Sequence, residues 1–73
     1  MNMKNIEILE RRSFSTHPDD KHLHIVLAKR PYKYSPDGWE YVTWIHNLSD
    51  GAFYHGHYFH DKEEAERDFW ERS

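Results

Sequence analysis

Four of the seven histidines in this 73-residue chain form two pairs at alternate positions, His22 with His24 and His55 with His57. Alternate side chains of a β-strand point to one face of a sheet, so each pair places two imidazole rings side by side. Zinc, nickel or copper needs three or four converging ligands, and no cysteine or acidic residue completes a known ligand pattern in this sequence. One hypothesis is therefore a metal-binding protein that uses these four histidines. The structural alternative is that they are hydrogen-bonded members of a half-exposed sheet face.

Histidines could also catalyse proton transfer, and His57, His60 and Asp61 lie close together in the sequence. General acid–base catalysis needs a histidine that a carboxylate orients. Asp61, however, has the position of a helix cap, and no nucleophile motif accompanies these residues. We therefore expect no enzyme activity and no cofactor. A histidine cluster still titrates near neutral pH, which predicts a pH-dependent association.

A short basic segment combines cations with aromatic rings, because Lys29, Arg30 and Lys33 alternate with Tyr32 and Tyr34. Proteins that bind single-stranded nucleic acid use this combination: the cations bind phosphates and the rings stack on bases. The formal net charge of -3 argues against a strong attraction to a phosphate backbone. A single-stranded nucleic-acid binder is thus an alternative function, and nucleic acid is not the expected partner.

Aromatic residues make up 16% of the chain, and this surplus is the main pointer to function. One helix cannot cover all the rings in the second half of the sequence. Exposed tyrosine and tryptophan side chains are enriched in protein interfaces. We therefore predict a small protein-binding module, either a homodimer or bound to a partner protein. The expected contact residues are Trp39, Tyr41, Tyr54 and Tyr58.

The elements that would position these residues follow from the hydrophobic pattern. Alternation, or a composition rich in β-branched and aromatic residues, predicts strands, and clusters of Pro, Gly, Ser and Asp predict the turns. In the first strand Leu9 is out of step with Ile6 and Ile8, which indicates an irregularity. The expected strands cover residues 4–14, 22–30, 39–46 and 53–59, and the expected turns cover residues 15–20, 31–38 and 47–51.

The last hairpin has two possible registers. A three-residue loop that ends at Gly51, with this glycine in the left-handed conformation, places Trp44 opposite Gly56 and His46 opposite Tyr54. The Trp44 indole would then cover a residue without a side chain, which stabilises glycine in a sheet. A two-residue turn shifts every pair by one and moves Trp44 away from the glycine. We favour the three-residue loop.

Residues 61–72 form the expected helix. Asp61 is followed three residues later by a glutamate, which is a capping-box pattern, and the first turns are rich in acidic residues that the helix dipole favours. Ala65 and Phe69 lie four residues apart on one helical face, with Trp70 beside them. The helix would lay this apolar stripe on the sheet, with Phe69 as the anchor.

Together these elements predict an α+β fold, an antiparallel four-stranded β-meander followed by one C-terminal α-helix packed on the sheet. Residues 1–73 have room for a single domain, because domains usually span about 50 to 200 residues. The chain has no cysteine, which fits a reducing cytoplasm, and no apolar run of the roughly 18 residues that a membrane span needs. A domain this small is near the limit for folding alone, which favours a homodimer.

Two segments, YVTW at residues 41–44 and GAFYHGHYF at residues 51–59, are followed by Ala65, Phe69 and Arg72. Over this C-terminal half the chain resembles small uncharacterised hypothetical proteins of Firmicutes and their phages. The resemblance implies a hairpin followed by a helix and a bacterial or phage cytoplasmic setting, and it transfers no catalytic residue. Small phage proteins often bind and block host machinery. By that analogy, the resemblance implies a phage or mobile-element protein that inhibits a host defence protein.

Overall fold

The computed structural model describes residues 6–13 and 22–72, and it confirms a four-stranded antiparallel sheet followed by one helix. The predicted turn at residues 15–20 lies outside the described residues. Neighbouring strands in the sheet follow the chain order β1-β2-β3-β4, which makes the sheet a meander. The elements are β1 (Glu7–Ser13), β2 (Leu23–Pro31), β3 (Trp39–Asn47), β4 (Phe53–Phe59) and α1 (Lys62–Glu71).

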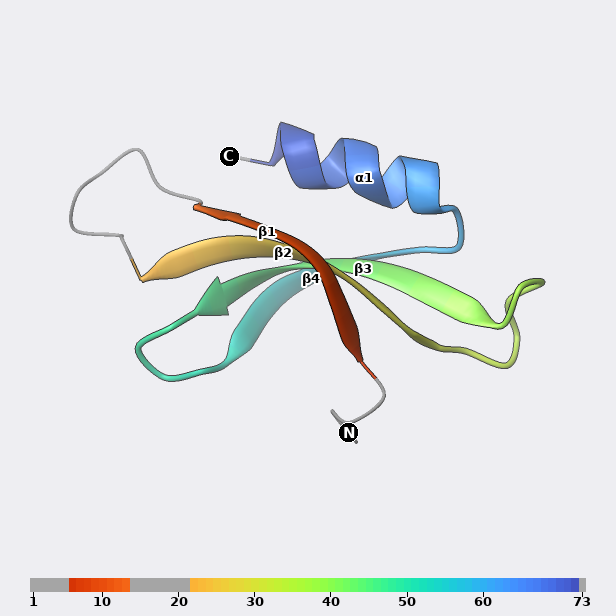
Figure 1. The fold of residues 1–73 in the computed structure, drawn as a ribbon, viewed down its shortest axis with the longest axis horizontal. Helices are drawn as coiled ribbons and strands as arrows, with labels where there is room; N and C mark the ends of the chain where they lie inside the picture. The colour runs from red at the N-terminus through yellow and green to blue at the C-terminus, as the bar shows by residue number, and fades with distance from the viewer. Residues whose placement is uncertain (1–5, 14–21, 73) are drawn as a thin grey trace.

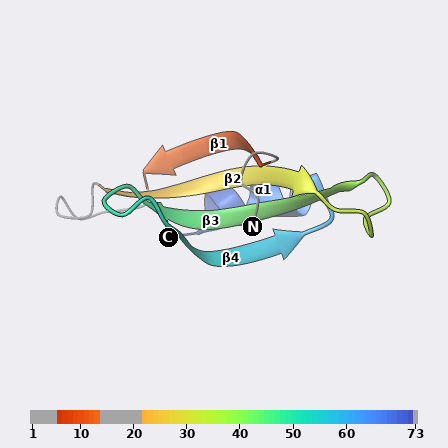
Figure 2. The same cartoon turned by 90° about the horizontal axis from the view of Figure 1, so that it is seen from below.

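The helix lies along one face of the twisted sheet (Figure 1). Seen from below, the sheet lies in front of the helix and shows its other face (Figure 2). Among residues 6–13 and 22–72, no helix has the length and the apolar character that a membrane span requires.

The main core lies between α1 and the sheet. Ala65 and Phe69 of α1 are completely buried, and they pack with Ile25 and Leu27 of β2 in one apolar cluster. The prediction that Phe69 anchors the helix is confirmed. Trp70 follows it by one residue, which rotates its side chain away from the sheet, and it is 63% exposed. The apolar stripe therefore does not include Trp70.

Both ends of α1 are capped. Asp61 is the N-cap, as predicted, and its Oδ1 atom accepts a hydrogen bond from the Glu63 N–H at 2.9 Å. The last turn contains no basic residue. Arg12 of β1 supplies the cation instead, because its Nη2 atom donates to the carbonyl oxygens of Phe69 and Arg72.

Both edge strands contain an irregularity. In β1 the register shifts between Ile8 and Glu10, so the irregularity predicted at Leu9 is a bulge. In β4 the pairing with β3 shifts near His55, which has a positive φ of 53°. Bulges at the edges of a sheet hinder pairing with a strand of another chain.

The β3–β4 loop is one residue longer than predicted. Gly51 has the predicted left-handed conformation, with a φ of 73°. His46 pairs with Phe53, however, so the prediction that it pairs with Tyr54 is wrong. The reason is that the Asn47 N–H donates a hydrogen bond to the Ala52 carbonyl at 2.9 Å. The loop between these two residues therefore has four residues, and the last pair of the hairpin is His46 with Phe53.

The bulge in β4 compensates for this shift. Beyond it, Thr43 pairs with His57 in the predicted register. The Trp44 indole consequently lies on Gly56, as predicted. A Cβ atom added to Gly56 would lie only 2.6 Å from the Trp44 Nε1 atom, so this position leaves no space for a side chain.

Candidate functional site

We name the sheet face opposite α1 the open face (Figure 2). Its centre is a second apolar cluster, Val26, Ala28, Val42 and Trp44, and all four residues are buried. The Trp44 ring contacts the rings of Phe53 and Tyr58 in β4, at centroid distances of 5.3 and 6.4 Å. Rings on the open face thus cover one another within a single chain, although no helix in the described part of the chain lies on this face.

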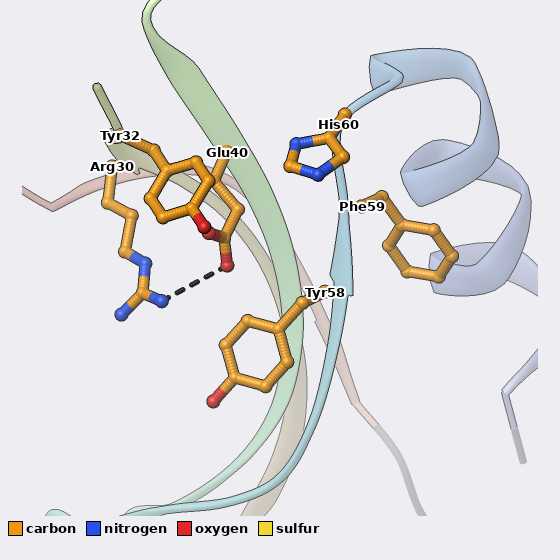
Figure 3. A pocket seen from close by; sticks show the side chains of 6 residues that line it. All are labelled: Arg30, Tyr32, Glu40, Tyr58, Phe59 and His60. Carbon is orange, nitrogen blue, oxygen red and sulfur yellow. Dashed lines mark hydrogen bonds and ion pairs between the residues drawn. The ribbon is translucent and has the colours of Figure 1, made fainter. Parts of the chain in front are cut away.

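A shallow pocket of about 370 Å³ opens at one end of the sheet. It lies where the loop between β2 and β3 meets the short segment between β4 and α1. Figure 3 shows the rings of Tyr32, Tyr58 and His60 around the Glu40 carboxylate, with Phe59 turned toward the helix. The residues that line the pocket are Arg30, Tyr32, Glu40, Tyr58, Phe59 and His60.

The charged part of the pocket is an ion pair between neighbouring strands. Arg30 of β2 and Glu40 of β3 are register partners, and Arg30 Nη2 donates to Glu40 Oε1 at 3.1 Å. The Glu40 side chain is only 8% exposed, so its charge interactions are weakly screened. The Arg30 guanidinium also lies 5.3 Å from the centroid of the Tyr58 ring, a cation–π contact. Arg30 therefore positions both the carboxylate and one aromatic wall.

The second aromatic wall is a stacked pair of rings, Tyr32 and His60, whose centroids are 5.7 Å apart at an interplanar angle of 25°. The Tyr32 N–H donates to the Gly38 carbonyl at 2.9 Å, which closes the β2–β3 loop and holds Tyr32. His60 directly precedes the Asp61 N-cap, so the start of the helix holds His60. A turn and a helix cap thus bring together rings that are distant in the sequence.

The other end of the open face carries a basic cluster. The Arg11 Nη1 atom lies 2.9 Å from Nδ1 of His46 and 3.3 Å from Nδ1 of His24. The His46 ring stacks on Phe53 with a centroid distance of 4.2 Å. Burial, together with the positive charge of Arg11, lowers the pKa of His46 below its ordinary value. The neutral imidazole suits this position, because its Nδ1 atom can then accept the Arg11 hydrogen bond.

A polar network joins α1 to the sheet on the helix side. Asp68 Oδ2 accepts from Thr43 Oγ1 at 2.5 Å and lies 2.9 Å from Nδ1 of His57, and Arg72 Nη1 donates to Thr43 Oγ1 at 3.0 Å. Burial raises the pKa of Asp68, but the hydrogen bonds from Thr43 and His57 outweigh it, and the net effect is a lowered pKa. Thr43 is fully buried and joins the helix to the sheet through this network, whereas the His57 side chain is half exposed.

The four predicted partner-contact residues do not form one surface. Tyr41 is buried in the core under α1, and Trp39 is partly buried on the same side, with Lys29 Nζ 4.3 Å from its ring centroid. Tyr54 is exposed, and its hydroxyl donates to an aspartate of the hairpin loop. Tyr58 pairs with a residue of the open-face cluster and is 53% exposed, so it alone of the four combines exposure with that face.

The four predicted metal ligands, His22, His24, His55 and His57, do not converge. β3 separates the strand that carries the first pair from the strand that carries the second. His24 lies on the open face, whereas His57 bonds to Asp68 on the helix side. In the part of the chain that the structure describes, no group of three or more His, Cys, Asp or Glu side chains could hold a metal ion.

The basic segment predicted to bind single-stranded nucleic acid divides between two sides of the sheet. Lys29 points to the helix side. Lys33 and Tyr34 contact each other, with Nζ 5.0 Å from the ring centroid. Arg30 and Tyr32 both line the pocket, and the Tyr34 ring makes an edge contact with the Tyr32 ring at a centroid distance of 5.6 Å. Two of the five residues thus line the pocket, and Tyr34 adjoins it.

Glu40 and His60 line the pocket. The sequence raised His60 only as a catalytic histidine, which we did not expect, and it gave no indication of Glu40. Strand alternation could have placed Glu40 on the same face as Arg30, because the two strands are consecutive. Nothing in the sequence places His60 beside the β2–β3 loop, since that contact depends on where the chain leaves β4.

Comparison of the chain with protein-family models, with curated proteins and with solved structures found no match in any of the three. The resemblance to small proteins of Firmicutes and their phages thus stays a prediction.

Proposed function

We propose that the chain is a small non-enzymatic protein-binding module and that the open face is its contact surface. One observation carries the proposal: no other helix or strand among residues 6–13 and 22–72 covers the apolar centre of the open face. Ile8 pairs with Ala28 of this centre and is 39% exposed, and Tyr58 is more exposed still. Exposed apolar side chains around a buried apolar centre are typical of a protein interface.

The edges of the sheet are less suited to binding than its face. The bulges near Ile8 in β1 and near His55 in β4 interrupt the backbone groups that a further strand would pair with. The contact would therefore come from side chains of the open face. This supports a complex in which the open face packs against a partner, and it argues against a complex in which a strand of the partner extends the sheet at its edge.

The open face is long and narrow. The molecule measures 41 × 25 × 16 Å along its principal axes, and the open face, which Figure 2 shows, spans the longest and the shortest of them. A standard protein interface buries about 800 Å² of each partner, so a contact of that size would take up the whole open face. A second copy of the chain is the first partner to test, because a domain of this size is near the limit for folding alone.

The test is the oligomeric state measured by size-exclusion chromatography with light scattering. We expect a dimer for the wild-type chain and a monomer for Ile8→Glu, because a carboxylate on the open face would have to be buried in the contact. Trp70→Glu is the matched control, since Trp70 is an exposed ring on α1, and it should leave the dimer intact. Circular dichroism checks that both variants fold.

A monomeric wild-type chain would exclude the second copy as partner. In that case, affinity capture with wild-type and Ile8→Glu chains as bait tests the face itself. A partner that Ile8→Glu loses and Trp70→Glu keeps would support the proposal. If the substitution at Ile8 changes neither the oligomeric state nor the set of captured proteins, the proposed function is wrong. The narrower idea, a host defence protein as the partner, rests on the resemblance alone.

A further inference from the structure

We propose that the pocket at the end of the sheet binds a nucleobase, with a preference for guanine, which stacks on the aromatic walls and forms hydrogen bonds with Glu40 and Arg30. The pocket lies at one end of the open face and shares Tyr58 with the protein contact proposed above, whereas Ile8 lies outside it. The base could come from a free nucleotide or from one position of a single strand, and the test distinguishes the two.

The size of the pocket suits one ring system. Ligand pockets have volumes of about 300 to 1,000 Å³, and this pocket, at about 370 Å³, lies at the lower end. It is open to one side, so a large cofactor would remain mostly outside it. A planar base can enter with one edge first and leave its sugar in solvent.

The walls present flat surfaces to such a ligand. Tyr58 comes from β4, Tyr32 from the loop after β2, and His60 from the segment before α1 (Figure 3). Any of the nucleobases can stack on a tyrosine or histidine ring, because every base has a π-face. The cation–π contact with Arg30 and the stacked pair hold the rings in place before a ligand arrives, which reduces the entropy that binding costs.

The floor of the pocket selects the kind of ligand. Arg30 and Glu40 place a donor and an acceptor side by side, 3.1 Å apart, and their charges cancel. A simple anion would be repelled by Glu40, and a simple cation by Arg30. The edge of a nucleobase matches both, because donors and acceptors alternate along it.

Guanine fits this floor best among the bases. Its N1–H and N2–H groups lie next to each other and can both donate to one carboxylate, and the adjacent O6 accepts from a guanidinium. Glu40 keeps this capacity although it is paired with Arg30, since a carboxylate accepts about four hydrogen bonds and the bond from Arg30 Nη2 is made to Oε1. Uracil and adenine offer a single donor group at the corresponding edge.

The test is a titration of the ¹⁵N-labelled chain, followed by NMR, with GMP, AMP, UMP and a single-stranded RNA oligonucleotide that contains guanine. We expect shifted amide signals around Tyr32, Tyr58 and His60 and the tightest binding for GMP. Shifts with the oligonucleotide alone would also support the site and would identify a strand as the source of the base. No shift with any of the four ligands would overturn the proposal.

Two variants separate recognition from nonspecific binding. Glu40→Gln has nearly the same shape, and it should weaken GMP about tenfold and remove the preference over AMP, because an amide cannot accept two adjacent donors as a carboxylate does. Tyr32→Ala should weaken all bases alike. Leu48→Ala is the control, since Leu48 is an exposed side chain in the β3–β4 loop and lies outside the pocket lining. Equal binding by all three variants would refute the site.

The Ile8→Glu variant tests the protein contact and the nucleobase site separately. Ile8→Glu should bind GMP like the wild type, because Ile8 does not line the pocket. If the wild-type chain binds GMP but forms no protein complex, the nucleobase site is supported and the protein contact is wrong. If it forms the complex but binds no base, the protein contact is supported and the nucleobase site is wrong.

Discussion

Arg12 Nη2 donates to the carbonyl oxygen of Phe69 at 2.7 Å, and this hydrogen bond joins residues 57 positions apart in the sequence. The Arg12 Nε atom donates to the same carbonyl at 3.0 Å. The guanidinium also lies 5.4 Å from the centroid of the Phe69 ring. The first strand thus caps the C-terminal end of the helix whose Phe69 side chain anchors the core.

Replacing Arg12 with methionine should destabilise the fold by about 1 to 3 kcal/mol, because hydrogen bonds from a charged donor to the helix carbonyls are lost while the aliphatic stem is kept. Urea unfolding followed by tryptophan fluorescence measures the change. Arg67→Met is the control, since Arg67 is exposed on α1, and it should change the unfolding free energy by less than about 0.5 kcal/mol. Equal losses in the two variants would contradict the capping role.

Gly56→Ala should destabilise the fold by about 1 to 3 kcal/mol, because the new methyl group would overlap the Trp44 indole. A double-mutant cycle with Trp44→Leu tests this cause. The alanine should cost much less in the Trp44→Leu background, where the indole is absent. If the cost of the alanine is the same in both backgrounds, the Tyr58 hydroxyl, 2.8 Å from the added Cβ atom, and not the indole determines it.

The stability of the fold should fall as the pH drops below about 6.5, partly through His46. Burial and the charge of Arg11 lower the pKa of His46 from 6.5 in the folded chain. The unfolded chain therefore takes up a proton at a higher pH than the folded chain, so folding is favoured above this range and loses free energy as the pH falls through it. NMR titration of the His46 ring should give a midpoint below 6.5.

The same titration on Arg11→Gln checks the cause of the His46 shift. Removing the positive charge should move the His46 midpoint upward and reduce the loss of stability in acid. Burial is the larger cause, so the midpoint should stay below its value in an unstructured peptide. A midpoint that does not respond to Arg11→Gln would show that the hydrogen bond between the two side chains is not formed in solution.

The sequence alone predicts the four strands, the helix and their order, because these depend on local signals. The alternation of Leu23, Ile25 and Leu27 marks β2. Asp61 marks the start of α1, and Gly51 marks the left-handed turn residue, and the structure confirms both. Each signal lies within a few residues of the feature that it predicts, so no long-range information is needed.

The candidate sites were less predictable, because they depend on contacts between distant segments. The sequence indicated aromatic and histidine clusters, but the residues divided between the two faces of the sheet, so Tyr41 is buried and the histidine pairs are apart. A one-residue difference in loop length changed the partner of His46, and a bulge at His55 restored the contact between Trp44 and the glycine. The bulge in β4 and the length of the β3–β4 loop cannot be predicted from the composition of these segments.

Local chemistry thus decides which segments become strands and helix, since each backbone conformation responds to its nearest side chains. Tertiary structure decides which side chains meet, since neighbouring side chains of a strand point to opposite faces and a shift of one residue exchanges them. Arg30 meets Glu40 and His60 meets Tyr32 only because the register and the helix cap of this fold bring them together.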